Sequence, residues 1–254
     1  MSKRQRDKES DDKGSSRRMK MDSKTPLRKS PKKSKTKIRI AEALLRKQWA
    51  AMELHEREST GLKESHPALH FAAFLDGYVD VVEMLIKNGV DVNAVQKEDG
   101  KTALHIVSQH GHVDTLKVLI QNGADVNAVC GEMKSTIPLH IGSEYGHADV
   151  VNILIQNGAD VNAVRTRYGD TALLIACDRR RIEVLNVLLQ NGAAINAVDR
   201  MRSTALHQLA YERDEHTTQE LALLLLRNGI DVNAVNEYGD TALSLSLIHI
   251  SEPT

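Results

Sequence analysis

Aromatic residues are scarce in this chain. Only 3% of its 254 residues are Phe, Trp or Tyr, whereas 41% are hydrophobic. That apolar content is enough for a core in one large domain or two modest ones. Because the core has to be built from Leu, Ile, Val and Ala, the composition favours helices in thin repeated layers over a thick sandwich or barrel.

Cysteine is nearly absent as well. Cys130 and Cys177 are too few for a disulfide framework and neither has a neighbour at metal-ligand spacing, which favours a reducing, intracellular compartment. The first residues are charged and polar, unlike a secretion signal, and the longest purely apolar run, 221–226, is far shorter than the ~20 residues of a membrane span. We therefore expect no membrane partner.

The net charge is zero, but the two signs are unevenly placed. Residues 1–39 hold 16 Lys and Arg against 5 Asp and Glu, so this arm has a net charge of +11 and the rest of the chain has −11. Residues 1–37 contain few large apolar side chains and cannot bury enough surface to offset the entropy of ordering. They are predicted to form a disordered basic tail.

A dense cationic string in this tail resembles a nuclear import signal. Lys32, Lys33 and Lys35 form its centre, and Arg17 and Arg18 lie upstream at the distance of a two-part signal. An import receptor is then one partner, and a nuclear or nucleocytoplasmic location is favoured over a cytoplasmic one. Two alternatives stay open: a tail that only aids solubility, and a tail that neutralises nucleic-acid phosphates.

The segment 38–60 shows helical periodicity. Apolar residues recur every three or four positions, as along one face of a helix, at Ile38, Ala41, Leu45, Trp49 and Met52. We predict an amphipathic helix that caps the unit following it or, alternatively, docks onto a partner.

From residue 64 onward the chain repeats itself. The pattern Asn-Gly-x-x-x-Asn-Ala-Val occurs five times, and its glycines are spaced by 34, 35, 34 and 37 residues at Gly89, Gly123, Gly158, Gly192 and Gly229. A second pattern, Thr-Ala-Leu-His or a close variant, recurs in phase at residues 68–70, 102–105, 138–140, 171–174, 204–207 and 241–244. Two interlocked patterns at one period indicate a tandem repeat.

Both patterns resemble the ankyrin repeat over about residues 64–244, with five complete copies and a sixth begun. The resemblance implies an all-α ankyrin-repeat solenoid of stacked helix-turn-helix units with short β-hairpin-like fingers. Thr102, Thr171 and Thr204 stand where a hydroxyl can cap the first helix, and Pro138 fits the first helical position. The Asp-Val-Asn-Ala-Val segment is predicted to be extended and to lead into the finger.

Histidines recur in register at His70, His105, His140 and His207. Equivalent positions of a solenoid lie one repeat apart, too far for a single metal with ~2 Å bonds, and the resemblance implies a structural hydrogen bond instead. No cysteine with a base, glycine-rich phosphate loop or carboxylate pair stands out. We therefore expect a non-enzymatic chain with no catalytic site, metal or cofactor.

The resemblance implies that a partner protein binds variable positions on the concave surface. At the solvent end of the first helices these positions are Phe74, Leu75, Gln109, His110, Glu144, Tyr145, Asp178, Arg179, Tyr211 and Glu212. At the finger tips they are Lys97, Met133, Arg167, Tyr168, Arg200 and Arg202. Tyr and Arg among mixed charges suit a protein partner, and the repeats themselves are not expected to bind nucleic acid.

Two copies depart from the pattern. In the fourth copy Leu174 replaces the histidine, and Arg179 to Arg181 replace the glycine between the helices, which predicts a basic patch able to recognise an acidic segment. In the fifth copy, extra residues before Gly229 predict a longer loop over 211–219, and loops that interrupt a regular array are frequent contact sites.

The last ten residues, 245–254, abandon the pattern and resemble a translated sequencing adapter. On that interpretation the natural sequence is interrupted near Ser244, within the sixth copy.

Three functional hypotheses follow. The favoured one is a scaffold that binds a partner protein through the concave surface, in nuclear or transcriptional regulation. The second is a substrate-recognition segment of a larger enzyme or ubiquitin-ligase adaptor. The third is a nucleic-acid-associated protein that acts through its basic tail.

Overall fold

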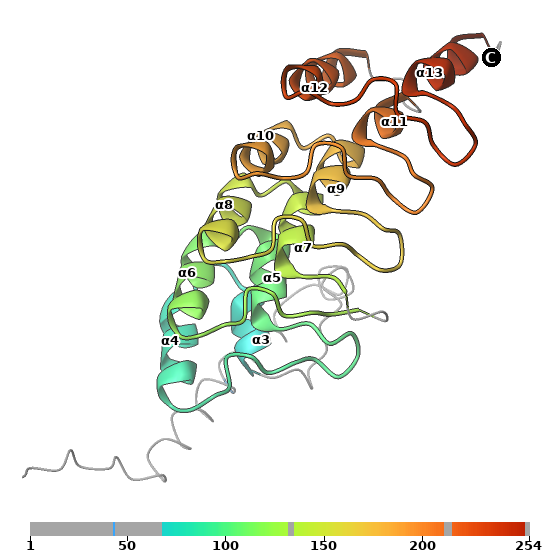
Figure 1. Ribbon diagram of the computed structural model, residues 1–254. Coiled ribbons are helices and arrows are strands. Elements are labelled where there is room, and N and C mark those ends of the chain that lie inside the picture. Colours follow the sequence, from blue (N-terminus) through green and yellow to red (C-terminus); the bar gives the residue numbers. More distant parts are fainter. Residues whose placement is uncertain (1–42, 44–67, 132–134, 211–214, 252–254) are drawn as a thin grey trace, which may run out of the picture.

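The computed structural model describes residues 43, 68–131, 135–210 and 215–251 of the chain. These residues form helices in consecutive pairs (Figure 1), and no strand occurs among them. The pairs are α3 (Ala68–Phe74) with α4 (Val79–Lys87), α5 (Ala103–His110) with α6 (Val113–Gln121), α7 (Pro138–Tyr145) with α8 (Ala148–Gln156), α9 (Ala172–Asp178) with α10 (Ile182–Gln190), and α11 (Ala205–Ala210) with α12 (Glu215–Arg227). The all-α solenoid is confirmed.

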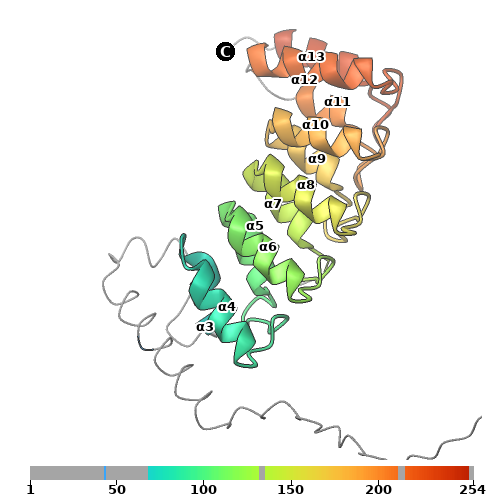
Figure 2. The same cartoon turned by 90° about the vertical axis from the view of Figure 1, so that its left-hand side faces the viewer.

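The pairs stack along one axis. The first helices form one column, from α3 to α11 and on to α13 (Ala242–Ser251), and the second helices form a parallel column from α4 to α12 (Figure 1). Seen from the side, successive pairs lie one above another in a stack that leans to one side (Figure 2). Because each pair packs only on its neighbours, stability is expected to be close to a sum of repeat and interface contributions.

The basic tail 1–37 lies outside the described residues, as does almost all of the predicted helix 38–60. Ala43 is the one residue of that segment that the structure describes, and it is helical.

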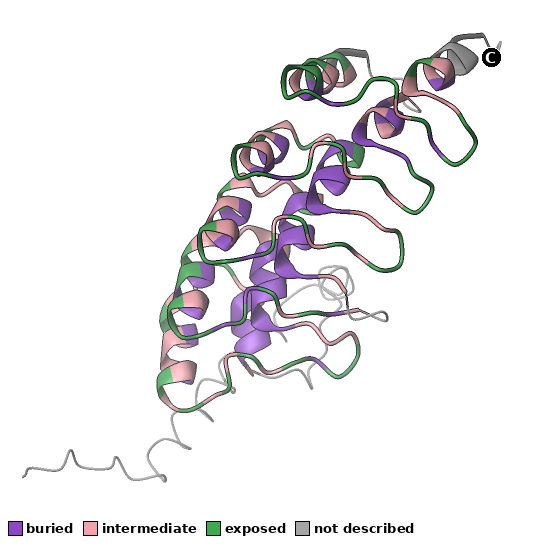
Figure 3. Cartoon of the chain, viewed as in Figure 1, coloured by how far each residue is buried: buried purple, intermediate pink, exposed green. Residues whose placement is uncertain are grey.

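The core runs between the two columns of helices. In α6, Leu116 and Leu119 are fully buried, while Val113 and Ile120 pack at its edge, as the helical periodicity predicts. Figure 3 shows that the first helices from α3 to α9 are almost entirely buried and that the second helices bury one face only. Leucine, valine, isoleucine and alanine supply nearly all of this core, in keeping with the scarcity of aromatic residues.

A threonine stands at the start of three of the first helices, α5, α9 and α11, and its hydroxyl forms a hydrogen bond there. The hydroxyl of Thr171 accepts a hydrogen bond from the amide of Leu174, while Thr102 binds His105 Nδ1 through both its amide and its hydroxyl. Pro138 takes the first position of α7, where a backbone N–H would have no helical acceptor. The capping positions predicted from the sequence are confirmed.

The turn between the two helices of a repeat needs a left-handed residue. Gly146 supplies it after α7 with φ 87°, and a Cβ there would lie 2.8 Å from Arg181 Cδ. In the fourth repeat Arg180 fills the same position with φ 55°, a conformation that costs a non-glycine residue about 1–2 kcal/mol.

The prediction that the Asp-Val-Asn-Ala-Val segments are extended is wrong. They form turns, because the Asp125 carboxylate accepts the amide of Asn127 and the Asp125 carbonyl accepts the amide of Ala128. Each turn aims its asparagine at the next repeat, where Oδ1 of Asn127 accepts the amide of Asp160 at 2.9 Å. The same bond joins Asn93 to Asp125, Asn162 to Ala194, and Asn196 to Asp231.

The fingers that follow these turns are hairpin-like, as predicted. Isolated antiparallel bridges close three of them, at Cys130 with Thr136, Val164 with Thr171, and Val235 with Thr241. Successive fingers are also bonded to each other near their tips, for example through the amide of Arg200 and the carbonyl of Tyr168 at 3.1 Å. The fingers therefore form a continuous surface along one side of the stack (Figure 1).

The predicted loop over 211–219 is wrong for its second half. Residues 215–219 form the start of α12, which has 13 residues where the other second helices have 9. The extra residues contain neither Gly nor Pro, so they extend the helix instead of breaking it. Residues 211–214 lie outside the description.

The helix α13 continues to Ser251, beyond the point where the sequence pattern ends. Leu245 is 7% exposed and occupies the repeat position that Ile106 holds in α5. The segment after Ser244 thus begins by filling the place of a sixth first helix.

Candidate functional site

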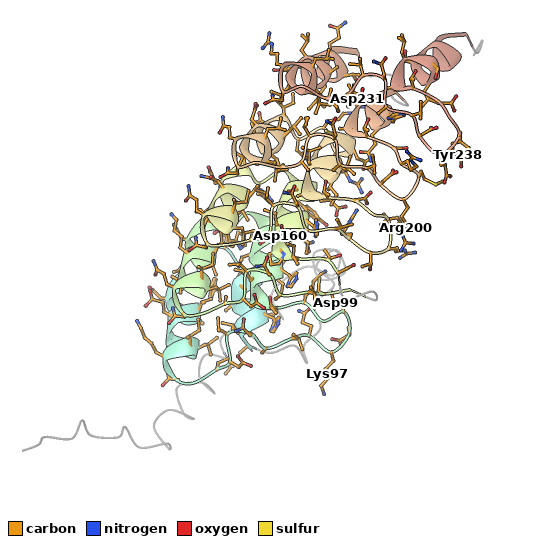
Figure 4. All side chains as sticks on the ribbon, viewed as in Figure 1. Lys97, Asp99, Asp160, Arg200, Asp231 and Tyr238 are labelled. Carbon is orange, nitrogen blue, oxygen red and sulfur yellow. The ribbon has the colours of Figure 1, made fainter. Side chains whose placement is uncertain are left out.

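The side of the solenoid that carries the fingers also carries the ends of the first helices. We call this surface, formed by fingers and first-helix ends, the finger face. Its exposed side chains include Lys97 and Arg200, both at the outer ends of their fingers (Figure 4). Asp160 and Asp231 lie further back, on the loops that leave the second helices.

One groove on the finger face brings the two predicted sets of residues together. It has a volume of about 390 Å³ and lies where the fourth repeat meets the fifth. We call it the junction groove; it is lined by Arg165, Arg167, Tyr168, Asp170, Leu174, Ile175, Asp178, Arg179, Asp199, Arg200, Met201 and Gln208. Five of these residues were predicted from the sequence, three of them at finger tips and two at the end of α9.

The other predicted contact residues are spread along the stack. Tyr145, Lys97 and Arg202 are exposed, and Gln109 is half-buried at the end of α5. Phe74 and Leu75 are half-buried against the core, so they are less available to a partner than predicted. Met133, Tyr211 and Glu212 fall outside the described residues, and so do Lys32, Lys33 and Lys35.

His110 is held inside the surface. Its ring meets that of Phe74 edge-on at 4.9 Å and stacks on His112 at 5.7 Å. Burial, followed by the charges of His112 and His147, lowers the pKa of His110 to about 4. At neutral pH this residue presents a neutral ring that packs between repeats.

The repeated histidines have the structural role that the sequence predicts. His105 accepts the amide of Thr102 at Nδ1, so its Nε2 carries the proton and donates to the Thr136 carbonyl at 3.2 Å. Burial lowers the pKa of His105, and that of His140, to about 4. His70 and His207 make the same contact with a finger carbonyl at 3.0 Å, and His140 contacts the carbonyl of Ala163, in the turn before the finger, at 2.9 Å.

The predicted basic patch of the fourth repeat is bonded to the chain itself. Arg179 donates to Glu144 at 3.0 Å and also pairs with Asp178 at 3.4 Å. Arg181 donates to the Glu144 carbonyl at 3.2 Å, in the place where His147 binds the preceding repeat, and Arg180 donates to Thr218 at 2.9 Å. These guanidinium groups join repeats, so the idea of a free patch at 179–181 has to be corrected.

The unpaired cations lie instead at the finger tips. Among the described residues, Arg167, Arg200 and Arg202 form no ion pair with a carboxylate, whereas Arg165 is paired with Asp170 at 2.7 Å. The guanidinium carbon of Arg167 lies 5.2 Å from the centre of the Tyr168 ring, within the range of a cation–π contact. The guanidinium carbon of Arg165 lies 5.4 Å from the centre of the same ring, and Tyr168 is 50% exposed, so part of this cluster is accessible to a ligand.

Seven groove residues were not among the predicted contact residues: Arg165, Asp170, Leu174, Ile175, Asp199, Met201 and Gln208. A signal for Gln208 was present, because the other four complete repeats have an apolar residue at its position: Phe71, Ile106, Ile141 and Ile175. Nothing in the repeat pattern marks Arg165 or Met201.

The described residues show no arrangement for metal or nucleophilic chemistry. They contain no group of three His, Cys, Asp or Glu side chains that could hold a metal ion. Burial raises the pKa of Cys130 to about 11 and that of Cys177 to about 12, so both thiols stay protonated at neutral pH. Across the same residues, no helix has the length and apolar character needed to cross a membrane.

Comparison with known families agrees with the helix pairs, the capped first helices and the fingers. A family described as ankyrin repeats, in three copies, matches residues 33–130, 69–165 and 130–199, and the single ankyrin repeat matches residues 202–237. A comparison with curated proteins finds no match. The matched segments cover well over half of the sequence, and the chain therefore belongs to the ankyrin-repeat family.

Proposed function

We propose that this chain binds a partner protein through the finger face, the surface that lines the concave side of ankyrin arrays. Ankyrin repeats are in general protein–protein interaction modules, and proteins built from them are typically scaffolds without enzymatic activity. The observation that carries the proposal is the junction groove, in which finger-tip residues and helix-end residues share one hollow.

The side chains of this face suit a protein interface. Tyr145 and Tyr168 are 47% and 50% exposed, and they offer large rigid rings that gain burial when a partner covers them. Arg167 and Arg200 add guanidinium groups beside Tyr168. Tyr and Arg are among the residues that most often carry the binding energy of an interface.

A site-specific photocrosslinker tests the surface. A photoreactive phenylalanine is placed at Tyr145 or Tyr168 on the finger face, or at Lys117 on the exposed face of α6 as a matched control. After irradiation in cells, we expect one crosslinked species shared by the two finger-face positions and absent from the control. Crosslinks of equal strength from all three positions, or from position 117 alone, would contradict the proposal.

We further propose that the basic tail directs the chain to the nucleus, where the partner could act in transcriptional regulation. The excess of positive charge in residues 1–39 and the string at Lys32, Lys33 and Lys35 support this. Replacing these three lysines with Ala in a fluorescent fusion should abolish nuclear accumulation. Replacing Arg4, Arg6 and Lys8 with Ala removes the same charge outside the string and should leave import intact, so equal effects would count against a specific signal.

The same excess of charge favours nucleic-acid binding as a second candidate function. In that case the affinity for a duplex should fall steeply with salt concentration and disappear when residues 1–37 are deleted. Affinity that survives the deletion would exclude the tail as the binding element. Whether the array serves a larger enzyme or ligase adaptor is decided by sequencing the transcript past the codon for Ser244.

A further inference from the structure

The chain departs from its repeat pattern at two positions that both line the junction groove. Leu174 stands where four other first helices have the histidine that binds a backbone carbonyl in or just before a finger, and Gln208 stands where the other complete repeats have an apolar residue. Both residues line the same hollow, although 34 positions separate them in the chain.

The first departure gives the groove an apolar floor. Leu174 has no side-chain donor or acceptor, so no side-chain bond from its position in α9 reaches the finger that contains Arg200 and Met201. Leu174 itself is fully buried, and Met201 is 46% exposed at the rim. An apolar side chain that enters from solvent would contact Met201 and lie above Leu174.

The second departure places an unsatisfied polar atom beside that floor. The side-chain Oε1 of Gln208 is buried and accepts no hydrogen bond within the described part of the chain. A buried acceptor left unpaired is destabilising, whereas the apolar residue of the other repeats would avoid that cost. A ligand that brings an N–H donor, such as a peptide backbone, would satisfy it.

The rim of the groove is cationic. Arg167 and Arg200 form no ion pair among the described residues, while two of the three neighbouring carboxylates are in ion pairs, Asp170 with Arg165 and Asp178 with Arg179. The third, Asp199, accepts the backbone amide of Ser203, which leaves its charge in place. Two unpaired guanidinium groups thus stand against one unpaired carboxylate, and the excess charge at the mouth of the groove is positive.

We propose that the junction groove binds an acidic, extended peptide segment of the partner protein, with one apolar side chain over Leu174 and Met201. Carboxylates of the segment pair with Arg167 and Arg200, and a backbone N–H donates to Gln208 Oε1. This inference rests on the proposed function, since it names the class of partner that the finger face takes.

The test uses the full chain and fluorescein-labelled twelve-residue peptide pools. The first pool has Asp or Glu at flanking positions and a variable apolar residue at the centre. The second replaces the acidic residues with Lys, the third replaces the central residue with Gly, and a twelve-nucleotide oligouridine is the nucleic-acid probe. Fluorescence anisotropy gives the affinity of each probe.

We expect the acidic pool with the apolar centre to bind most tightly of the four probes. The double variant Arg167→Glu with Arg200→Glu should weaken it by about tenfold or more. A matched double variant on the second helices, Lys87→Glu with Lys117→Glu, changes the net charge equally and should weaken it by less than about twofold. Gln208→Ile, which copies the other repeats, should weaken it several-fold and leave the unfolding midpoint no lower.

Three results would overturn the inference. Equal losses in the two double variants would assign the affinity to overall charge or to the basic tail. Equal binding of the acidic and Lys pools would show that charge complementarity does not contribute to the affinity. Tighter binding of oligouridine, lost on Arg167→Glu with Arg200→Glu, would make the groove a nucleic-acid site.

Failure of this inference can be told apart from failure of the proposed function. If crosslinks to a partner persist from Tyr145 while no peptide pool binds the groove, the finger face still binds a protein, but not through an acidic segment in this groove. If both fail, the finger face itself has been wrongly assigned.

Discussion

The backbone amide of Asp160 donates to the side-chain oxygen of Asn127 at 2.9 Å, across the boundary between two repeats. The same asparagine donates through Nδ2 to the carbonyl of Gly158, also at 2.9 Å. One carboxamide thus serves a donor and an acceptor of the next repeat, and it does so on the exposed edge of the stack, away from the apolar core.

Removing this bridge should weaken the array although no apolar contact is lost. We expect Asn127→Ala to lower the free energy of unfolding by about 1–2 kcal/mol, because two inter-repeat hydrogen bonds disappear. Asn152, on α8, accepts a hydrogen bond from Gln156 of its own helix and from no other described residue, so Asn152→Ala should change stability by less than about 0.5 kcal/mol. Urea denaturation followed by circular dichroism measures both, and similar losses would show that the bridge is energetically silent.

A second prediction concerns the core between the helix columns. Leu119 is fully buried in α6, and Leu119→Ala should cost about 2–5 kcal/mol through lost apolar burial and the cavity left behind. Lys117→Ala, two positions earlier on the exposed side of the same helix, is the control and should be close to neutral. A thermal midpoint of Leu119→Ala equal to that of the parent chain would mean that the helical register is wrong.

Gly146 and Gly158 separate two effects of replacing glycine. Both have φ near +90°, so Ala is strained at either position by about 1 kcal/mol. A Cβ at position 146 would also lie 2.8 Å from Arg181 Cδ, whereas nothing lies within 4 Å of one at position 158. The flexible Arg181 side chain can swing away by giving up its bond to the Glu144 carbonyl, so Gly146→Ala should be more destabilising by about 1 kcal/mol in urea denaturation, and equal effects would argue against this close approach.

Acid should destabilise the array through its buried histidines. The pKa of His105 is about 4 in the folded chain and ordinarily 6.5, so between these values the unfolded chain takes up a proton that the folded chain does not. The stabilising effect of the neutral ring is complete above pH 6.5 and is lost as the pH falls toward 4, at roughly 1.4 kcal/mol per pH unit for each such histidine.

The variant His105→Leu, which copies Leu174, tests this assignment. It should lower stability at pH 7 and show a shallower decline between pH 6.5 and 4.5 than the parent chain. Urea midpoints at pH 7.5, 6.0 and 5.0 give both curves. Curves that stay parallel over this range would mean that His105 does not carry the pH dependence.

The sequence predicted most of what is repeated within one unit, the Asp-Val-Asn-Ala-Val turn being the exception. The positions of Thr102, Gly146 and Leu119 follow from helix capping, turn conformation and helical period, and all of these act over a few residues. For the same reason the histidine contact could be assigned as structural before its acceptor was known.

Contacts between repeats could not be predicted from the sequence. The hydrogen bond between Asn127 and Asp160 depends on the offset between successive repeats along the stack, and the pairing of Arg179 with Glu144 depends on the same offset. The extra residues of the fifth repeat were assigned to a loop because insertions usually lengthen loops, whereas 215–219 contain no helix breaker. Gln208 was visible as a departure, but burial of its oxygen is a property of two repeats in contact.

The asparagine bridge has a consequence for how such a chain can change over generations. The asparagine oxygen accepts a hydrogen bond from a backbone amide, which every residue except proline has. Position 194 can therefore be Ala where the other copies have Asp, and its amide still donates to Asn162. The asparagine is present in all five copies. When a gene segment that encodes one repeat is duplicated in tandem, the new repeat therefore carries the asparagine that bonds to its neighbour. The array can then lengthen before any surface residue has changed.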